Sequence, residues 1–183
     1  MWIILGIILL VIIIMILIYN SLIRKKNYVT EAWASIDVQL KKKANVLTNV
    51  VDTLKMQTNY EKETLSKIMS MREKMLTGNK DEVIKANDAI SKMMRPIFGL
   101  AENYPQLQAN SGFLKLMDHI KDVEEKIAYS RTRYNVAVMQ YNSSLQTFPT
   151  NIFANILKFK PERSYEISAV EREYSDNLRI GDL

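Results

Sequence analysis

Apolar residues fill the first part of the chain without a break. From Trp2 to Ile18 no residue is charged, and the apolar character continues to Ile23. At a rise of 1.5 Å per residue, about 22 residues form a helix of about 33 Å, which exceeds the roughly 30 Å of a hydrocarbon core. A cleavable signal peptide would carry a basic start and a small-residue cleavage site, and the run has neither. The pattern therefore predicts an uncleaved transmembrane anchor over residues 1–23.

Beyond the anchor, apolar positions recur every three or four residues, which is the spacing of amphipathic helices. A first helix is predicted to begin near Thr30 and to run on to Met75, with a local bend or turn in the polar stretch 57–63. Gly78 and Asn79 end this helix, and so short a turn makes the next helix an antiparallel neighbour. The apolar face of the first helix comprises Trp33, Ile36, Leu40, Ala44, Leu47, Val51 and Leu54.

Two more long patterns and a short one follow. The second helix is predicted to be capped by Asp81 and kinked near its end by Pro96. The third carries apolar residues from Phe113 to Leu145, and a short amphipathic helix is predicted over 152–157. No segment alternates apolar and polar residues as a half-buried strand does. The predicted fold class is all-α: an N-terminal transmembrane helix followed by an antiparallel bundle of long helices.

The domain organisation follows from these patterns. About 160 residues remain after the anchor, which is the usual size of one domain. We expect the anchor over residues 1–23, the helical bundle over 24–160, and a polar, partly ordered tail over 161–183.

The net charge of +5 comes largely from basic residues that follow the anchor. These are Arg24, Lys25, Lys26, Lys41, Lys42 and Lys43. A basic residue near a membrane attracts anionic headgroups by about 1 kcal/mol, so this excess needs no nucleic acid as its partner. We expect Arg24, Lys25 and Lys26 to contact lipid headgroups. The positive-inside rule then places the N-terminus outside the cell membrane and the bundle in the cytoplasm.

The sequence offers no set of residues for catalysis. Its lack of Cys excludes disulfides, thiolate metal sites and an acylated cysteine. The single histidine, His119, has no Glu three residues before it, as a di-iron bundle would require, and it borders an apolar face. A catalytic triad and a phosphate-binding glycine loop are equally unsupported. We therefore expect no metal, no cofactor and no enzymatic activity, and a hydrolase is the least favoured class.

One motif repeats within the third helix. Tyr134-Asn135 recurs seven residues later as Tyr141-Asn142, and Arg131 precedes both. Two helical turns place the two Tyr side chains on one face and the two Asn side chains beside them. The pattern is typical of a bundle seam with interhelical hydrogen bonds from the phenols. It is also compatible with a polar, aromatic stripe that binds a partner helix.

Motifs along nearly the whole chain after Tyr19 resemble the LemA family of bacterial membrane-anchored proteins. The residues that carry the resemblance are Tyr19-Asn20, Leu22, Glu31-Ala32-Trp33, Ile36-Asp37-Val38-Gln39-Leu40-Lys41, Val50-Val51, Lys55, Tyr104-Pro105, Leu107, Ala109-Asn110, Phe113, Glu124, Ile127-Ala128, Arg131, Arg133-Tyr134-Asn135, Tyr141-Asn142, Phe148-Pro149 and Ala154. The resemblance implies a membrane-tethered, LemA-like four-helix arrangement without an established enzymatic activity. It also implies a protein or membrane partner, because family genes occur beside membrane metalloprotease genes and relatives act in magnetosome membrane formation.

The leading hypothesis is a non-enzymatic scaffold or adaptor at the membrane. Its partners would be the lipid bilayer and a protein at the membrane, with a membrane protease as one candidate, and the oligomeric state stays open. We expect the partner to bind the Tyr134–Tyr141 face or the helix that carries Trp33, Asp37 and Leu40. The expected partner-binding residues are Trp33, Asp37, Arg131, Tyr134, Asn135, Tyr141 and Asn142. The alternative hypothesis is a membrane-surface binding or membrane-shaping protein, in which Ile152, Phe153, Ile156 and Leu157 enter one leaflet.

Overall fold

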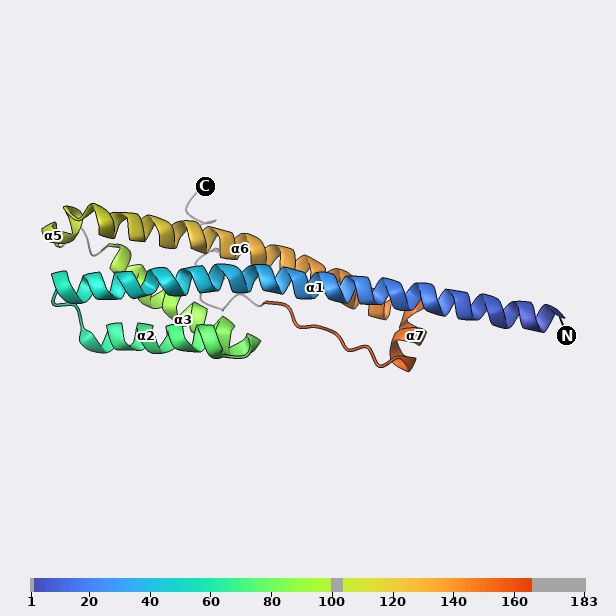
Figure 1. Ribbon diagram of the computed structural model, residues 1–183. Helices are drawn as coiled ribbons and strands as arrows, with labels where there is room; N and C mark the ends of the chain where they lie inside the picture. The colour runs from blue at the N-terminus through green and yellow to red at the C-terminus, as the bar shows by residue number, and fades with distance from the viewer. Residues whose placement is uncertain (1, 100–103, 166–183) are drawn as a thin grey trace, which may run out of the picture. The chain divides into compact units, whose positions relative to one another are not determined.

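A computed structural model describes residues 2–99 and 104–165 (Figure 1). The helices are α1 (Trp2–Gln57), α2 (Lys62–Thr77), α3 (Lys80–Phe98), α5 (Pro105–Gln108), α6 (Ser111–Gln146) and α7 (Thr150–Ile156). Over these residues no strand occurs, and the predicted all-α class, a long apolar N-terminal helix followed by packed helices, is confirmed. The described residues form two compact units, a first unit of 2–35 with 130–165 and a second unit of 36–99 with 104–129.

The predicted start of the first long helix is wrong, whereas a turn does interrupt it in the polar stretch 57–63, as predicted. α1 is one helix of 56 residues that begins in the apolar run. Thr30 does not cap a new helix, because its hydroxyl donates to the Lys26 carbonyl inside α1. At the other end α1 stops at Gln57, since the Thr58 hydroxyl bonds the Leu54 carbonyl and also accepts the Tyr60 amide. Such local side-chain bonds compete with the helical ladder, so the polar stretch forms a turn and α2 begins at Lys62.

The apolar start of α1 exposes its side chains on all sides. In the described part of the chain, α1 is the one helix long and apolar enough to cross a membrane. Most large apolar side chains from Trp2 to Leu17 are between 37% and 82% exposed. Burial begins at Leu22, which is 1% exposed. The apolar run is therefore a candidate membrane anchor and is not part of the protein core.

In the first unit, α1 and α6 run antiparallel. The Trp33 ring contacts the Tyr134 ring, and earlier along α1 the Lys25 ammonium donates to the Ser144 hydroxyl further along α6. The buried residues between the helices include Leu22, Val29, Ala32, Tyr134, Ala137, Val138 and Tyr141. After α6 the chain forms α7, and residues 158–165 then return along α6 without helical structure. The first residues of the predicted tail, 161–165, thus lie along α6, and residues 166–183 lie outside the described part.

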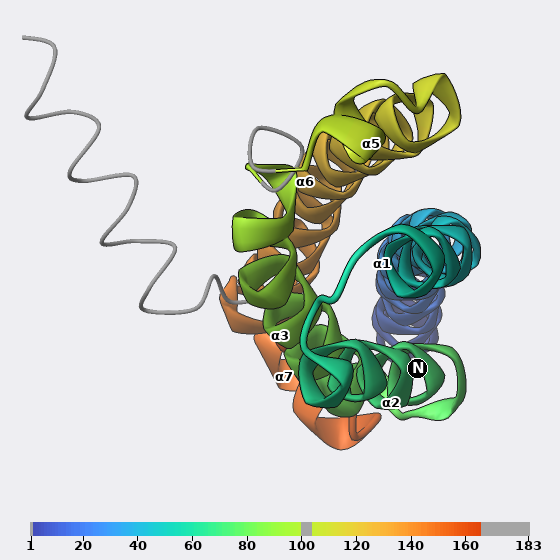
Figure 2. The same cartoon turned by 90° about the vertical axis from the view of Figure 1, so that its left-hand side faces the viewer.

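The second unit is built from residues 36–57 of α1 together with α2, α3, α5 and residues 111–129 of α6. Figures 1 and 2 show α2 and α3 side by side as a helical hairpin. The predicted cap at Asp81 is wrong, because Asn79 caps α3 in a capping box with Glu82. Gly78 is required before it, since a Cβ at this position would lie 2.6 Å from the Lys74 carbonyl oxygen. Pro96 lies inside α3, which ends at Phe98.

A charged network lies inside the second unit. Lys43 is 0% exposed, and its ammonium lies 2.6 Å from Glu124 Oε1, 2.7 Å from Asn87 Oδ1 and 2.9 Å from Ser91 Oγ. Ser91 Oγ also donates to Glu124 Oε1 over 2.9 Å. The network connects α1, α3 and α6. Its bonds compensate the positive charge of Lys43, which would destabilise the fold if it were buried without partners. Lys43 is therefore a core residue, and the expectation that it belongs to a basic cluster beside the membrane is wrong.

Candidate functional site

The repeated Tyr-Asn motif of α6 holds the returning segment by its main chain. Asn142 donates from Nδ2 to the Glu162 carbonyl over 2.8 Å and accepts the Glu162 amide over 3.0 Å. Asn135 makes the same pair of bonds with Tyr165, over 3.0 Å to its carbonyl and 2.8 Å from its amide. We call Tyr134, Asn135, Tyr141 and Asn142 the Tyr–Asn clamp, and residues 160–165 the held segment.

The two tyrosines of the clamp add a second, parallel row of bonds. The Tyr141 hydroxyl donates to the Lys160 carbonyl over 3.0 Å, and the Tyr134 hydroxyl donates to the Arg163 carbonyl over 2.9 Å. All six clamp bonds therefore reach backbone atoms. Their partners are fixed by the extended path of the held segment and do not depend on its side chains.

Helix and extended-chain geometry explain why the motif repeats after seven residues. Seven residues of α-helix rise about 10.5 Å. Three residues of extended chain cover about 10 Å. Each row of bonds advances by seven residues on α6 and goes back by three on the held segment, which runs antiparallel to α6. A seven-residue repeat on a helix is thus matched to a three-residue repeat on an extended peptide.

One side chain of the held segment is anchored as well. Tyr165 is 1% exposed, and its ring centroid lies 6.5 Å from that of Trp33. The Arg131 guanidinium carbon lies 4.9 Å from the Tyr165 ring centroid, in cation–π range. Trp33 also contacts the Tyr134 ring edge-on at 5.4 Å. The site thus combines backbone recognition with one aromatic pocket.

Burial affects the ionisation of the clamp. The pKa of Tyr141 lies above its ordinary value of 10.0, because burial disfavours the phenolate and the nearby Glu162 carboxylate repels it. Tyr141 is therefore neutral at physiological pH and able to donate its proton to Lys160 O.

The structure brings together six of the seven residues predicted to bind a partner. Trp33, Arg131 and the four residues of the Tyr–Asn clamp surround the held segment. Asp37 instead pairs with Lys41 one turn further along α1, at 2.6 Å. The hydroxyls of Tyr134 and Tyr141 donate to carbonyls of the non-helical held segment, whereas a bundle seam predicts hydrogen bonds between helices. That these residues bind a partner protein stays a prediction.

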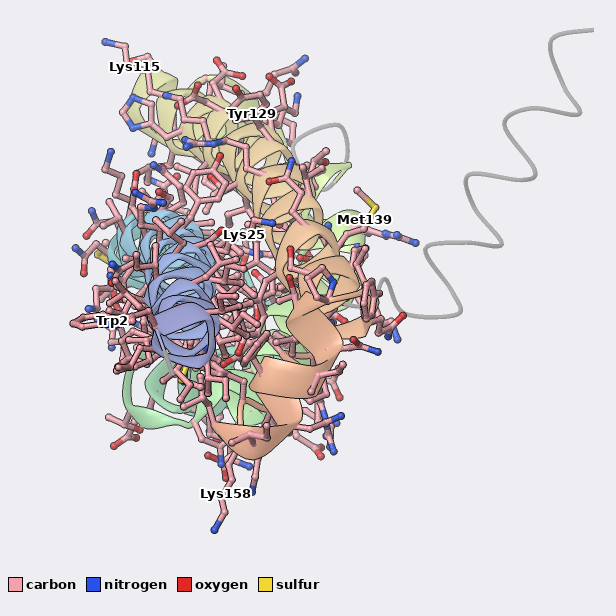
Figure 3. All side chains as sticks on the ribbon, turned by 90° about the vertical axis from the view of Figure 1, so that its right-hand side faces the viewer. Trp2, Lys25, Lys115, Tyr129, Met139 and Lys158 are labelled. Carbon is pink, nitrogen blue, oxygen red and sulfur yellow. The ribbon has the colours of Figure 1, made fainter. Side chains whose placement is uncertain are left out.

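The three residues predicted to contact lipid headgroups differ in their surroundings. Arg24 and Lys26 are exposed, whereas Lys25 is half-buried and bonded to Ser144 (Figure 3). Headgroup contact stays a prediction for all three, and Arg24 and Lys26 are the better placed.

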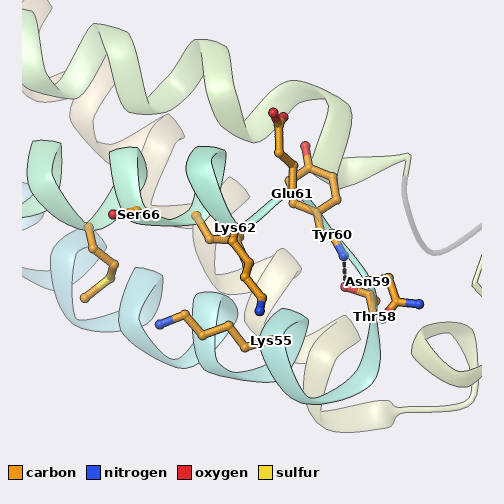
Figure 4. A pocket seen from close by; sticks show the side chains of 9 residues that line it. Lys55, Thr58, Asn59, Tyr60, Glu61, Lys62 and Ser66 are labelled. Carbon is orange, nitrogen blue, oxygen red and sulfur yellow. Dashed lines mark hydrogen bonds between the residues drawn. The ribbon is translucent and has the colours of Figure 1, made fainter.

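His119 and a cavity near the end of α1 lie outside the Tyr–Asn clamp. Among the described residues, no group of His, Asp and Glu side chains could hold a metal ion, and His119 is exposed. A cavity of about 670 Å³ lies where the chain turns from α1 into α2, and Lys55 and Lys62 extend into it (Figure 4). The pKa of Tyr60 beside it is raised by burial and by Glu61. Glu61 is the one carboxylate among the residues that line the cavity, so the lining lacks the two carboxyl groups of a general acid and base.

Sequence reasoning missed the occupant of the clamp. The held segment has no apolar periodicity, so nothing in its pattern connected it with α6. A weak signal was present, because the aromatic residue Tyr165 follows the polar stretch Glu162-Arg163-Ser164. Lys43 had a clearer signal, since it falls three residues after Leu40 and four before Leu47 on the apolar face.

The chain matches the family model of the LemA family over residues 32–176. The chain belongs to the LemA family. The resemblance found in the sequence motifs is thereby confirmed. The chain is also 29% identical to Protein LemA of Metamycoplasma hominis over 163 residues. These residues are 88% of this chain and 74% of that protein. LemA proteins are not known as enzymes, and together with the apolar start of α1 the family indicates a membrane-associated protein.

Two magnetosome proteins are similar over a shorter range. Magnetosome protein MamQ 2 of Paramagnetospirillum magneticum is 26% identical over 83 residues, which are 45% of this chain and 30% of that protein. Magnetosome protein MamQ of Magnetospirillum gryphiswaldense is 24% identical over 78 residues, which are 43% of this chain and 29% of that protein. The likeness therefore covers less than half of this LemA chain and under a third of each magnetosome protein.

Proposed function

We propose that this LemA protein is a non-enzymatic, membrane-tethered adaptor whose Tyr–Asn clamp binds an extended segment of a partner protein. One observation carries the proposal: all six hydrogen bonds of the clamp reach backbone atoms. A site that recognises main chain accepts many sequences, as sheet edges do when they bind extended peptides. The partner segment takes the place of residues 160–165, with an aromatic side chain where Tyr165 now lies.

Tethering supports weak binding of this kind. Two proteins confined to one membrane surface meet at a raised effective concentration, so a short segment is sufficient for specific association. A membrane protease is one candidate partner, since its own chain would be confined to the same surface.

Crosslinking in native membranes tests the adaptor. A photo-crosslinking amino acid at Val136 or Met139, which are 40% and 59% exposed on α6, should capture one defined protein. The same group at Leu114, 41% exposed at the other end of α6, is the matched control and should not. An excess of a synthetic peptide of residues 158–165 should abolish capture in membrane vesicles that expose the bundle, and the same peptide with Tyr165→Ala should not. Capture that persists in the double variant Asn135→Ala, Asn142→Ala would refute the clamp as the binding site.

The adaptor faces the cytoplasm in this proposal. Arg24, Lys25 and Lys26 directly follow the apolar run, and the positive-inside rule places them on the cytoplasmic side. A C-terminal epitope tag should resist protease in intact cells and be digested after lysis. Digestion in intact cells would reverse the orientation.

A second candidate function, binding of the membrane surface, is favoured by a different observation. Apolar side chains at and around α7 are exposed in the first unit, although the unit has a core in which apolar side chains are buried.

A further inference from the structure

α7 presents apolar side chains to its surroundings. Phe148 is 76% exposed, Ile152 49%, Ile156 64% and Leu157 37%, whereas Ala154 on the other side of the helix is 2% exposed. Ile152 and Ile156 are spaced by four residues, which places them on one face of α7, and Phe148 lies in the turn just before the helix. Four large apolar residues so close together form a patch that a monomer in water rarely presents.

A ring contact fixes α7 at one level of the anchor. Lys158 has a φ of 56°, in the left-handed region, and the Phe159 amide bonds back to the Ala154 carbonyl. This turn ends α7 and brings the Phe159 ring to 6.0 Å from that of Tyr19. Tyr19 directly follows the unbroken apolar run Trp2–Ile18.

The level of Tyr19 is where the surface of α1 changes from apolar to polar. Asn20 follows directly, and the exposed Arg24 and Lys26 lie one to two turns further. Tyrosines are enriched at this depth of a membrane, where the ring meets the headgroups. If the apolar run crosses the bilayer, α7 therefore lies at the boundary between headgroups and acyl chains.

The direction and charge of α7 fit the same boundary. Within the first unit, α7 runs crosswise to the anchor part of α1, both in Figure 1 and in the view along α1 in Figure 3. A helix that is crosswise to a membrane-spanning helix lies in the plane of the leaflet. Lys158 and Lys160, which follow α7, are both exposed and can reach anionic headgroups.

We infer that α7 and its flanks form a second membrane contact, in which Phe148, Ile152, Ile156 and Leu157 enter the leaflet beside the anchor. The bilayer itself covers this patch, because the contact between Phe159 and Tyr19 places α7 at the same depth as the end of the apolar run. The inference rests on the membrane tethering in the proposed function. It adds a contact that holds the first unit against the surface.

Depth-dependent quenching tests the contact in the full chain. Because the protein has no Cys, a single introduced Cys can carry an environment-sensitive nitrobenzoxadiazole label. Ile152→Cys and Ile156→Cys are labelled separately in lipid nanodiscs that contain phosphatidylglycerol and lipids with a nitroxide at a shallow or a deep acyl position. Both labels should lose most of their fluorescence to the shallow nitroxide, as expected for side chains about 5–10 Å into the interface.

Two controls separate this inference from the tethering on which it rests. Met139→Cys, at a position 59% exposed in the same unit, should stay unquenched, and Leu10→Cys in the anchor should be quenched by the deep nitroxide. Quenching at Leu10→Cys without quenching at either α7 position would refute the membrane contact of α7 and leave tethering intact. No quenching at Leu10→Cys would refute tethering itself. If the α7 labels stay unquenched and unlabelled Ile152→Cys forms a disulfide-linked dimer on oxidation by copper phenanthroline, a second copy covers the patch and the membrane contact is refuted.

Discussion

At the scale of single residues, Asn142 belongs to the repeated sequence motif and binds the held segment through two hydrogen bonds. Its side-chain amide satisfies both the amide and the carbonyl of Glu162. Asn142→Ala removes both bonds, and an unsatisfied backbone group costs about 1–3 kcal/mol. We expect the Glu162 amide to exchange its hydrogen roughly tenfold faster or more, which NMR-detected hydrogen exchange measures.

Matched variants make this result specific. Asn142→Asp keeps an oxygen that accepts the Glu162 amide but lacks the donor, so its effect should be intermediate. Asn45→Ala changes an exposed Asn on α1 and should leave the Glu162 amide unaffected. Equal exchange rates in all three variants would mean that Asn142 does not hold the segment in solution.

Tyr141 gives the clamp a pH limit. Burial first, and then the Glu162 carboxylate, raise the pKa of Tyr141 above 10.0 in the folded chain. Its contribution to stability is therefore complete below about pH 10 and is lost as the pH rises through the raised pKa, because the unfolded chain ionises first. The phenolate also cannot donate to Lys160 O. NMR of ¹³Cζ-labelled tyrosine should show one resonance that is absent from Tyr141→Phe and titrates above the range of free tyrosine.

The Glu162 contribution can be tested separately. Glu162→Gln removes the repulsion and leaves the burial, so the pKa of Tyr141 should fall part of the way towards its ordinary value. A pKa that does not move would assign the whole shift to burial.

The residues of the clamp were predictable, but their partner was not. A repeat of Tyr-Asn at seven residues is visible in the sequence because helical periodicity makes it one face. The held segment follows no periodicity, and its bonds use backbone atoms that every residue has. A sequence pattern carries no information about where such a segment lies.

At the scale of helices, the buried network around Lys43 decides how α1, α3 and α6 meet in the second unit. Lys43→Met removes the ammonium and leaves the Glu124 carboxylate and the Asn87 amide without this partner. Breaking a buried pair on one side costs about 3–5 kcal/mol, and the partial exposure of Glu124, 29%, favours the lower end. Chemical unfolding of the full chain in detergent, followed by circular dichroism, measures the loss.

The neighbouring lysine is the matched control for this variant. Lys42→Met alters the net charge equally but lies on the exposed side of α1, so its effect should stay within about 0.5 kcal/mol. Equal stabilities for Lys43→Met and Lys42→Met would contradict a structural role for the buried charge.

Helix positions were predicted better than helix ends. Spacing of apolar residues is a property of many positions at once, so the helical segments of α1, α3 and α6 were recognised. The end of α1 at Gln57 depends on the hydroxyl of one residue, Thr58, with no Gly or Pro nearby. The start near Thr30 was wrong for the opposite reason, because a plausible capping residue is also tolerated inside a helix.

At the scale of the whole molecule, one segment accounts for membrane attachment in energetic terms. The run Trp2–Ile18 contains fourteen Ile, Leu and Val residues. At about 0.3–0.6 kcal/mol each, they favour insertion by about 4–8 kcal/mol. The basic residues after the run add about 1 kcal/mol each at an anionic surface. The apolar run therefore outweighs every other membrane contact proposed for the chain.

This ranking predicts that two charges in the run detach the protein. An arginine at the centre of a spanning helix costs about 2.5–3.5 kcal/mol, so Leu10→Arg with Ile13→Arg cancels most of the gain. The double variant should leave the alkali-washed membrane fraction in which the unaltered chain remains. The control places two arginines at exposed apolar positions outside the run, Val38→Arg and Leu114→Arg, and should stay with the membrane. If the Leu10→Arg, Ile13→Arg variant stays with the membrane, a surface other than the apolar run attaches the protein. The exposed face of α7 would then be the next segment to alter.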